Sequence, residues 1–193
     1  KRSFFPHRLC DQLILTATPI PRTLAMTLYG NLDYSVIDEM PKGRKEIETI
    51  ALSETRRDEI FQKISKKCHE GNQVYWVCPI IDESEVLECK AAIKTHEQIK
   101  KNLKKINVGL IHGRMKMQEK EQVMRDFRNK KIDLLVSTTI IEVGLDVPNA
   151  TVIIIENSER MGLSQLHQLR GRVGRGDKKS TCICLLYTSP SPR

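Results

Sequence analysis

Long apolar runs are missing from this sequence of 193 residues. No run approaches the roughly 18 apolar residues that a membrane-spanning helix requires. The first residues, K-R-S-F-F-P-H, lack the apolar region of a signal peptide. We therefore expect a cytoplasmic protein that has no membrane partner.

Metal-binding patterns are missing as well. The six cysteines contain no C-x-x-C, and Cys68-His69 has no second ligand pair at a suitable spacing. Most of these cysteines sit in apolar segments, where a reducing compartment lets them act as small buried hydrophobes. We expect free thiols and no metal site.

The composition that remains is that of a globular protein with a basic surface. Hydrophobic residues make up 39% of the chain and charged residues 29%. Lysine and arginine outnumber the acids 32 to 24, which gives a formal charge of +8 and a pI near 9.2. This balance favours a polyanionic partner such as nucleic acid or nucleotide phosphate.

Strand and helix patterns alternate from residue 46 onward. Alternation of this kind predicts an α/β fold in which a parallel sheet carries helices on both faces. Ligands of such sheets bind beyond the carboxyl ends of the strands, and we expect an arginine-rich segment near the C-terminus to reach that edge. Strands are expected at residues 47–52, 73–78, 108–111, 134–137, 152–155 and 181–185, and helices at 55–70, around 92–103, at 117–129 and at 164–170.

The two ends of the chain are expected to differ from this domain, residues 46–186. Residues 1–43, with a possible strand at 33–37, are too short to enclose a core and are interpreted as the remnant of a preceding domain. Residues 187–193 are interpreted as a non-native tail, since T-S-P-S-P-R resembles one-frame translation of a transposase sequencing adapter.

Residues 168–176, Q-L-R-G-R-V-G-R-G, form the most distinctive segment. Arg170, Arg172 and Arg175 alternate with glycines, and planar guanidinium groups on a glycine-rich backbone suit a phosphate ligand. Taken alone, the segment is also compatible with a basic helix end followed by a turn.

Two further loops follow predicted strands. Thr138 and Thr139 carry hydroxyls that can donate to phosphate, and Gly144 and Asp146 come soon after them. Arg114 follows a strand in I-H-G-R. Each loop also has an ordinary explanation, as a threonine cap with exposed acids or as a solvated turn.

Four motifs in order resemble those of superfamily-two helicases, and together they resemble the RecG family of DNA motors. The motifs are L-T-A-T-P-I-P-R-T from Leu15, G-L-I-H-G-R-M-K from Gly109, S-T-T-I-I-E-V-G-L-D-V-P-N-A from Ser137 and Q-L-H-Q-L-R-G-R-V-G-R-G from Gln165. Mfd translocases share the pattern, but His167, H-G-R-M and Y-W-V-C-P favour RecG.

The resemblance implies two RecA-like (P-loop NTPase-type) domains with ATP and Mg²⁺ between them. Residues 1–43 would end the first domain, and residues 46–186 would form the second, the helicase C-terminal domain. The roles it implies are coupling for Thr16, Ala17 and Thr18, DNA-backbone contact for Arg114, Thr138 and Thr139, nucleotide contact for Gly144, Asp146 and Gln168, and catalysis by Arg172 and Arg175 as arginine fingers.

The sequence also lacks two motifs that such a motor needs. It contains no G-x-x-x-x-G-K-[ST], and no D-E-x-x box precedes Thr16, so it carries neither the phosphate-cradling loop nor the magnesium ligand. We expect a monomeric motor acting on branched or forked DNA in repair and recombination, represented here by an inactive fragment. The alternatives are an Mfd-type translocase and a non-catalytic nucleic-acid-binding module.

Overall fold

The computed structural model describes residues 35–37, 39, 44–79, 85–138 and 147–187, without the side chains of 85–88. The chain divides into two compact units, Lys1–Asp38 and Glu39–Arg193. All helices and strands in the described part of the chain belong to the second unit. Residues 35–37 lie in no strand, so the strand expected at 33–37 is wrong for these three residues.

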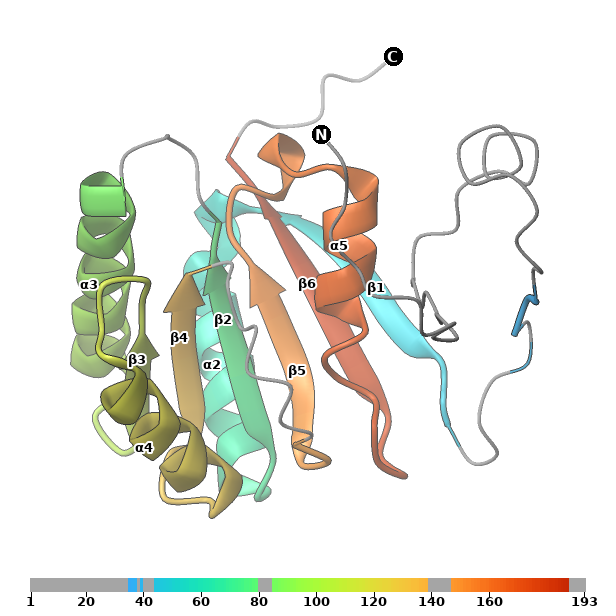
Figure 1. The fold of residues 1–193 in the computed structure, drawn as a ribbon, viewed down its shortest axis with the longest axis horizontal. Coiled ribbons are helices and arrows are strands. Elements are labelled where there is room, and N and C mark those ends of the chain that lie inside the picture. Colours follow the sequence, from blue (N-terminus) through green and yellow to red (C-terminus); the bar gives the residue numbers. More distant parts are fainter. Residues whose placement is uncertain (1–34, 38, 40–43, 80–84, 139–146, 188–193) are drawn as a thin grey trace, which may run out of the picture. The chain divides into compact units, whose positions relative to one another are not determined.

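The second unit is built on one six-stranded sheet in which every pairing is parallel. Its order is β1-β6-β5-β2-β4-β3, as Figure 1 shows. All carboxyl ends therefore share one edge of the sheet and all amino ends share the other. The strands are β1 (Ile47–Ser53), β2 (Gln73–Cys78), β3 (Val108–Ile111), β4 (Leu134–Thr138), β5 (Ala150–Ile155) and β6 (Ser180–Leu186).

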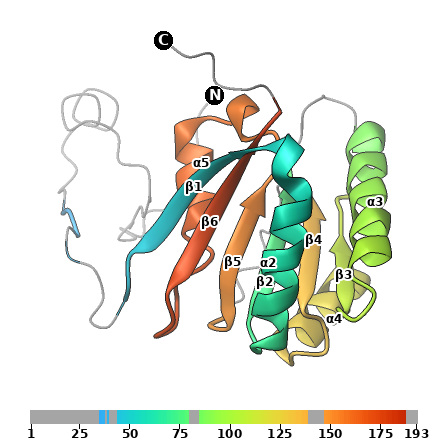
Figure 2. The ribbon, with the colours of Figure 1, turned by 180° about the vertical axis from the view of Figure 1, so that it is seen from behind.

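Helices cover both faces of this sheet. α2 (Arg57–His69) and α3 (Glu85–Asn102) pack on one face, where Trp76 is fully buried. α4 (Met117–Arg128) and α5 (Leu163–Arg170) pack on the other, around Phe127 and Leu169. The two faces can be compared in Figures 1 and 2. The predicted α/β architecture is confirmed.

The central strands β2, β4 and β5 are buried at every position, as expected for strands covered on both faces. The predicted elements of this unit agree with the structure to within one or two residues, except at two helices. α3 begins at Glu85, well before the expected start near residue 92, and the first helix is divided. There a 3-10 turn, η1 (Glu54–Arg56), precedes α2. The hydroxyl oxygen of Ser53 accepts a hydrogen bond from the Thr55 amide, so Ser53 caps this turn.

Candidate functional site: an arginine segment and the carboxyl-edge loops

The arginine segment, residues 168–176, begins in the last turns of α5 and continues as irregular backbone. Gln168 is exposed, Arg172 is half-buried, and Arg175 is exposed. The Arg172 amide donates to the Leu169 carbonyl at 2.9 Å, and Arg175 Nε donates to the Gly171 carbonyl at 3.3 Å. Arg172 makes no side-chain hydrogen bond or ion pair to the rest of the described chain, so its guanidinium is available to a ligand.

Three residues between and beside the arginines fix this segment to the domain. Val173 is fully buried in the core beneath α5. Gly174 has a φ of +73°, and a Cβ there would lie 2.9 Å from Ile47 Cγ1. A Cβ on Gly176 would lie 2.9 Å from the Pro148 carbonyl oxygen. These glycines are required for close packing and a left-handed backbone, so they hold the segment in place and do not loosen it.

The position of the segment corrects one expectation from the sequence. Ile47 and Ser180, which Gly174 approaches, are the first residues of β1 and β6, and Pro148 comes just before β5. The arginine segment therefore lies at the amino edge of the sheet, and the prediction that it reaches the carboxyl edge was wrong. The reason is topological: α5 leaves β5 at the carboxyl edge and must return to the amino edge before the parallel strand β6 begins.

Arg170 differs from the other two arginines in its surroundings. The pKa of the Cys182 thiol on β6 is raised, first by a hydrogen bond with Cys184 and then by burial, while the nearby charge of Arg170 opposes the rise. Arg170 thus lies close to the sheet. That Arg172 and Arg175 face a ligand stays a prediction.

The residues expected to touch DNA lie at the opposite, carboxyl edge. Arg114 is exposed in the turn after β3, and Thr138 is the last residue of β4. Because Ile111 pairs with Ser137, these two strand ends are neighbours. Thr138 is only 4% exposed, so its hydroxyl is not on the surface of the structure as it stands.

The turn that carries Arg114 contacts α3 through His112. His112 Nδ1 lies 3.4 Å from Cys89 Sγ on α3. Burial lowers the pKa of His112, and the positive charges of Lys120 and Arg114 lower it further. A lowered pKa favours the neutral imidazole near neutral pH, so His112 itself adds no positive charge beside Arg114.

Several residues with expected roles lie outside the described part of the chain. They are Thr16, Ala17 and Thr18 from the first unit and Thr139, Gly144 and Asp146 from the segment after β4. Their coupling, DNA and nucleotide roles stay predictions. The tail at residues 188–193 also lies outside the description; Tyr187, just before it, is exposed beyond the end of β6.

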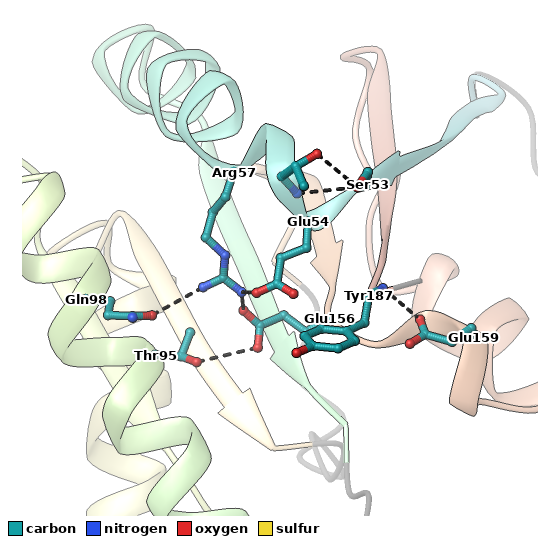
Figure 3. Close-up of polar contacts among 9 residues, drawn as sticks. Ser53, Glu54, Arg57, Thr95, Gln98, Glu156, Glu159 and Tyr187 are labelled. Atoms are coloured by element: carbon teal, nitrogen blue, oxygen red, sulfur yellow. Dashed lines mark hydrogen bonds and ion pairs between the residues drawn. The ribbon is translucent and has the colours of Figure 1, made fainter. Parts of the chain in front are cut away.

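Glu156 is a buried acid that our interpretation of the sequence did not single out. It directly follows β5, and its amide donates to the Val77 carbonyl of β2 at 2.9 Å. Its carboxylate pairs with Arg57 Nη2 at the start of α2, and Thr95 Oγ1 of α3 donates to it at 3.5 Å (Figure 3). The Arg57 guanidinium also lies 5.5 Å from the Trp76 ring centroid. This network joins α2, α3 and β5 at the carboxyl edge; an acid directly after an all-apolar strand was the available signal.

We expect Glu156→Gln to lower the free energy of unfolding by about 3 kcal/mol, because it leaves Arg57 charged and largely buried without its main partner. The side chains of Arg57 and Glu156 are 21% and 11% exposed. Glu54→Gln is the matched control: Glu54 is 3.7 Å from the same Arg57 Nη2 but 39% exposed, so its loss should cost under about 1 kcal/mol. Urea unfolding measures both, and equal losses would contradict the buried pair's role.

No described helix is long and apolar enough to cross a membrane. Within the same described ranges, no group of three or more His, Cys, Asp or Glu side chains is arranged to hold a metal ion. The described cysteines, Cys68, Cys78, Cys89, Cys182 and Cys184, are free thiols.

Comparison with known protein families identifies the class of protein to which this parallel sheet belongs, together with its arginine segment and its carboxyl-edge loops. The helicase conserved C-terminal domain matches residues 52–177, and the chain belongs to that family. The arginine segment and the segment after β4 both fall inside the match.

Within helicases, the chain is similar to RecG. It is 59% identical to the ATP-dependent DNA helicase RecG of Haemophilus influenzae and 57% identical to that of Escherichia coli K12, in each case over 98% of this chain. It spans 27% of the length of each of these relatives. The resemblance to RecG predicted from the four motifs is confirmed.

Solved structures agree with this assignment. A structure of RecG bound to a three-way DNA junction matches 90% of this chain, and 22% of its own, at 45% identity and a TM-score of 0.75. Yeast Dbp5 bound to RNA and ADP BeF3 matches 90% of this chain and 44% of its own at 15% identity and a TM-score of 0.64. The second likeness shows only that the fold is the RecA-like one.

Proposed function

We propose that this chain supplies the second motor domain of a RecG-type ATP-dependent DNA helicase, which remodels branched DNA and stalled replication forks in repair and recombination. In this proposal Arg172 and Arg175 are fingers for the ATP triphosphate, assisted by Gln168. Arg114, Thr138 and Thr139 bind the DNA backbone. The motor acts as a monomer in the bacterial cytoplasm, and Thr16–Thr18 couple the nucleotide state to DNA contact.

The observation that carries the proposal is the separation of two candidate phosphate-binding groups to opposite edges of one sheet. Strands of five or six residues place the edges roughly 17–20 Å apart. The chain crosses this distance once between Thr138, which ends β4 at the carboxyl edge, and Ala150, which begins β5 at the amino edge. One segment of the chain therefore connects the carboxyl edge, which is proposed to bind DNA, to the amino edge, which is proposed to face the nucleotide, as a motor requires.

In the proposal, Gly144 and Asp146 contact the nucleotide; both lie outside the described residues. Pro148, the next proline after them in the sequence, is the residue against which Gly176 packs. A nucleotide role for this stretch of the chain is therefore compatible with the position of the arginine segment.

The residues present fit only part of an ATP site. The arginine segment offers cations for phosphate oxygens, but the 193 residues contain no P-loop, and no D-E-x-x box for Mg²⁺ precedes Thr16. In the proposal, ATP and Mg²⁺ are held mainly by a preceding motor domain. When bound, Mg²⁺ would neutralise charge on the phosphates, while this chain would add the arginines from the other side.

The proposal is tested with a chimera in which residues 46–186 of this chain replace the matching segment of E. coli RecG. We expect the chimera to retain ATP hydrolysis stimulated by branched DNA, and the 193-residue chain alone to show none. A folded chimera that binds branched DNA but hydrolyses no ATP would contradict the motor assignment and favour a non-catalytic nucleic-acid-binding module. Hydrolysis by the chain alone would contradict the division of the ATP site between two domains.

A further inference from the structure

Basic side chains are concentrated at the amino edge of the sheet. Six segments meet there: residues 44–46, 66–72, 100–107, 128–133, 147–149 and 170–179. Together they hold sixteen Lys and Arg but four Asp and Glu. This excess of twelve positive charges is larger than the +8 of the whole chain, so the rest of the molecule is net negative.

Helix dipoles explain only part of this distribution. α2, α3, α4 and α5 all end at this edge with basic residues in their last turns, where cations are favoured. The effect falls off within the last turn. Lys131, beyond the end of α4, pairs with Asp126 at 3.2 Å. Lys104, Lys105 and Lys130 also lie beyond the helix ends, and neither the helix dipoles nor a described ion pair explains them.

The largest group of lysines beyond the arginine segment surrounds a cavity at the ends of α2 and α3. The cavity has a volume of about 280 Å³ and is lined by Ser65, His69, Lys101, Asn102, Lys104 and Lys105, with two apolar side chains behind them. The three lysines are exposed, and none pairs with a carboxylate among the described residues. His69 Nδ1 lies 2.6 Å from the Ser65 carbonyl, so it carries a proton. The polar lining is dominated by the three lysine ammonium groups, which suit phosphate.

This cavity is distinct from the arginine segment. It borders the start of β3, while the arginine segment borders the start of β6, and four strand spacings separate these strands in the sheet. At about 4.8 Å for each spacing, the two sites are roughly 19 Å apart along the edge. They also lie on opposite faces, since α2 and α3 cover one face and α5 the other (Figures 1 and 2).

We propose that the lysine cavity between α2 and α3 is a second DNA-binding site, which holds backbone phosphates of a duplex at the edge opposite to Arg114. The inference rests on the proposed function in that DNA is taken as the polyanion. Lysines act here as point charges on phosphate, so the site should bind without sequence preference. Further cations at residues 128–131, after α4, lie at the same edge of the sheet.

The test measures binding of the 193-residue chain to a short fluorescein-labelled DNA duplex by anisotropy over a range of salt concentrations. We expect the variant Lys101→Gln/Lys104→Gln/Lys105→Gln to bind roughly 10-fold more weakly or worse, and the slope of log K against log salt to fall by about 0.9 for each phosphate that the variant no longer neutralises. The matched control is Lys63→Gln/Lys90→Gln/Lys94→Gln. It removes the same charge from exposed positions on α2 and α3 away from the cavity.

The control separates a local site from the effect of net charge. Loss of affinity and slope in the cavity variant alone supports the site, whereas equal losses in both variants overturn it. Arg114→Gln tests the proposed DNA contact at the carboxyl edge. If Arg114→Gln weakens binding and the cavity variant does not, the second site is overturned while the proposed function stands. If neither variant changes binding, both DNA assignments are overturned.

Discussion

Replacing Arg172 or Arg175 by Ala in the chimera should lower DNA-stimulated ATP turnover by about 10³- to 10⁵-fold, the contribution of an arginine finger to phosphoryl transfer. At about 1.4 kcal/mol for each factor of ten, this is roughly 4 to 7 kcal/mol of transition-state stabilisation. The physical reason is that an arginine finger stabilises the negative charge that the transition state spreads over the γ-phosphoryl oxygens. Steady-state phosphate release with saturating branched DNA measures the effect.

Arg170→Ala is the matched control for this prediction. It removes the same guanidinium from the same segment, but Arg170 lies close to Cys182 and the sheet. The DNA-stimulated ATP turnover of the Arg170→Ala chimera should stay within about 10-fold of the turnover of the unsubstituted chimera. Equal losses for Arg170, Arg172 and Arg175 would show that the segment acts only through its total charge or its folding, and would remove the finger assignment. Circular dichroism and DNA binding of each variant establish that it is folded.

Gly174→Ala should destabilise the domain by about 2 to 5 kcal/mol. An Ala side chain in a left-handed conformation costs about 1–2 kcal/mol, and overpacking costs about 1–3 kcal/mol. Both apply, since Gly174 has a φ of +73° and its new Cβ would lie 2.9 Å from Ile47 Cγ1. Urea unfolding measures the loss. Turnover of the chimera should fall as well, because a displacement of about 1 Å at catalytic groups can cost 10²-fold.

Two comparisons make this prediction specific. Gly113→Ala changes an exposed glycine whose new Cβ would have nothing within 4 Å, so we expect a change within about 1 kcal/mol. Ile47→Ala removes the atoms that the new Cβ would meet. The double variant with Gly174→Ala should therefore be more stable than the two single effects predict when added. Strict additivity would show that no steric conflict exists at Ile47.

Local patterns in the sequence were sufficient to define most of the fold. Continuous apolar runs marked β2, β4 and β5, because a strand that is covered on both faces carries mainly apolar side chains on both. Helical periodicity placed α2 and α4, since one apolar stripe must face the sheet. The arginine segment was also evident, because its side chains and glycines are adjacent in sequence.

Long-range placement could not be obtained from those patterns. Glu156 and Arg57 are 99 residues apart, and only the neighbouring positions of β5, β2 and α2 bring them together. The cavity lysines likewise resembled ordinary solvated residues until the ends of α2 and α3 were seen side by side. Thr138 was expected at a surface, but the packing around β4 buries it.

The sequence by itself thus determined the class of fold, the likeness to RecG helicases and the identity of the arginine segment. Only the tertiary structure decided on which edge of the sheet that segment lies, and what its glycines do. The physical reason is that parallel strands force every connection to cross the sheet. The edge of the sheet at which a residue lies therefore depends on the path of the whole chain. Whether the residue lies in a helix or a strand depends mainly on its neighbours in sequence.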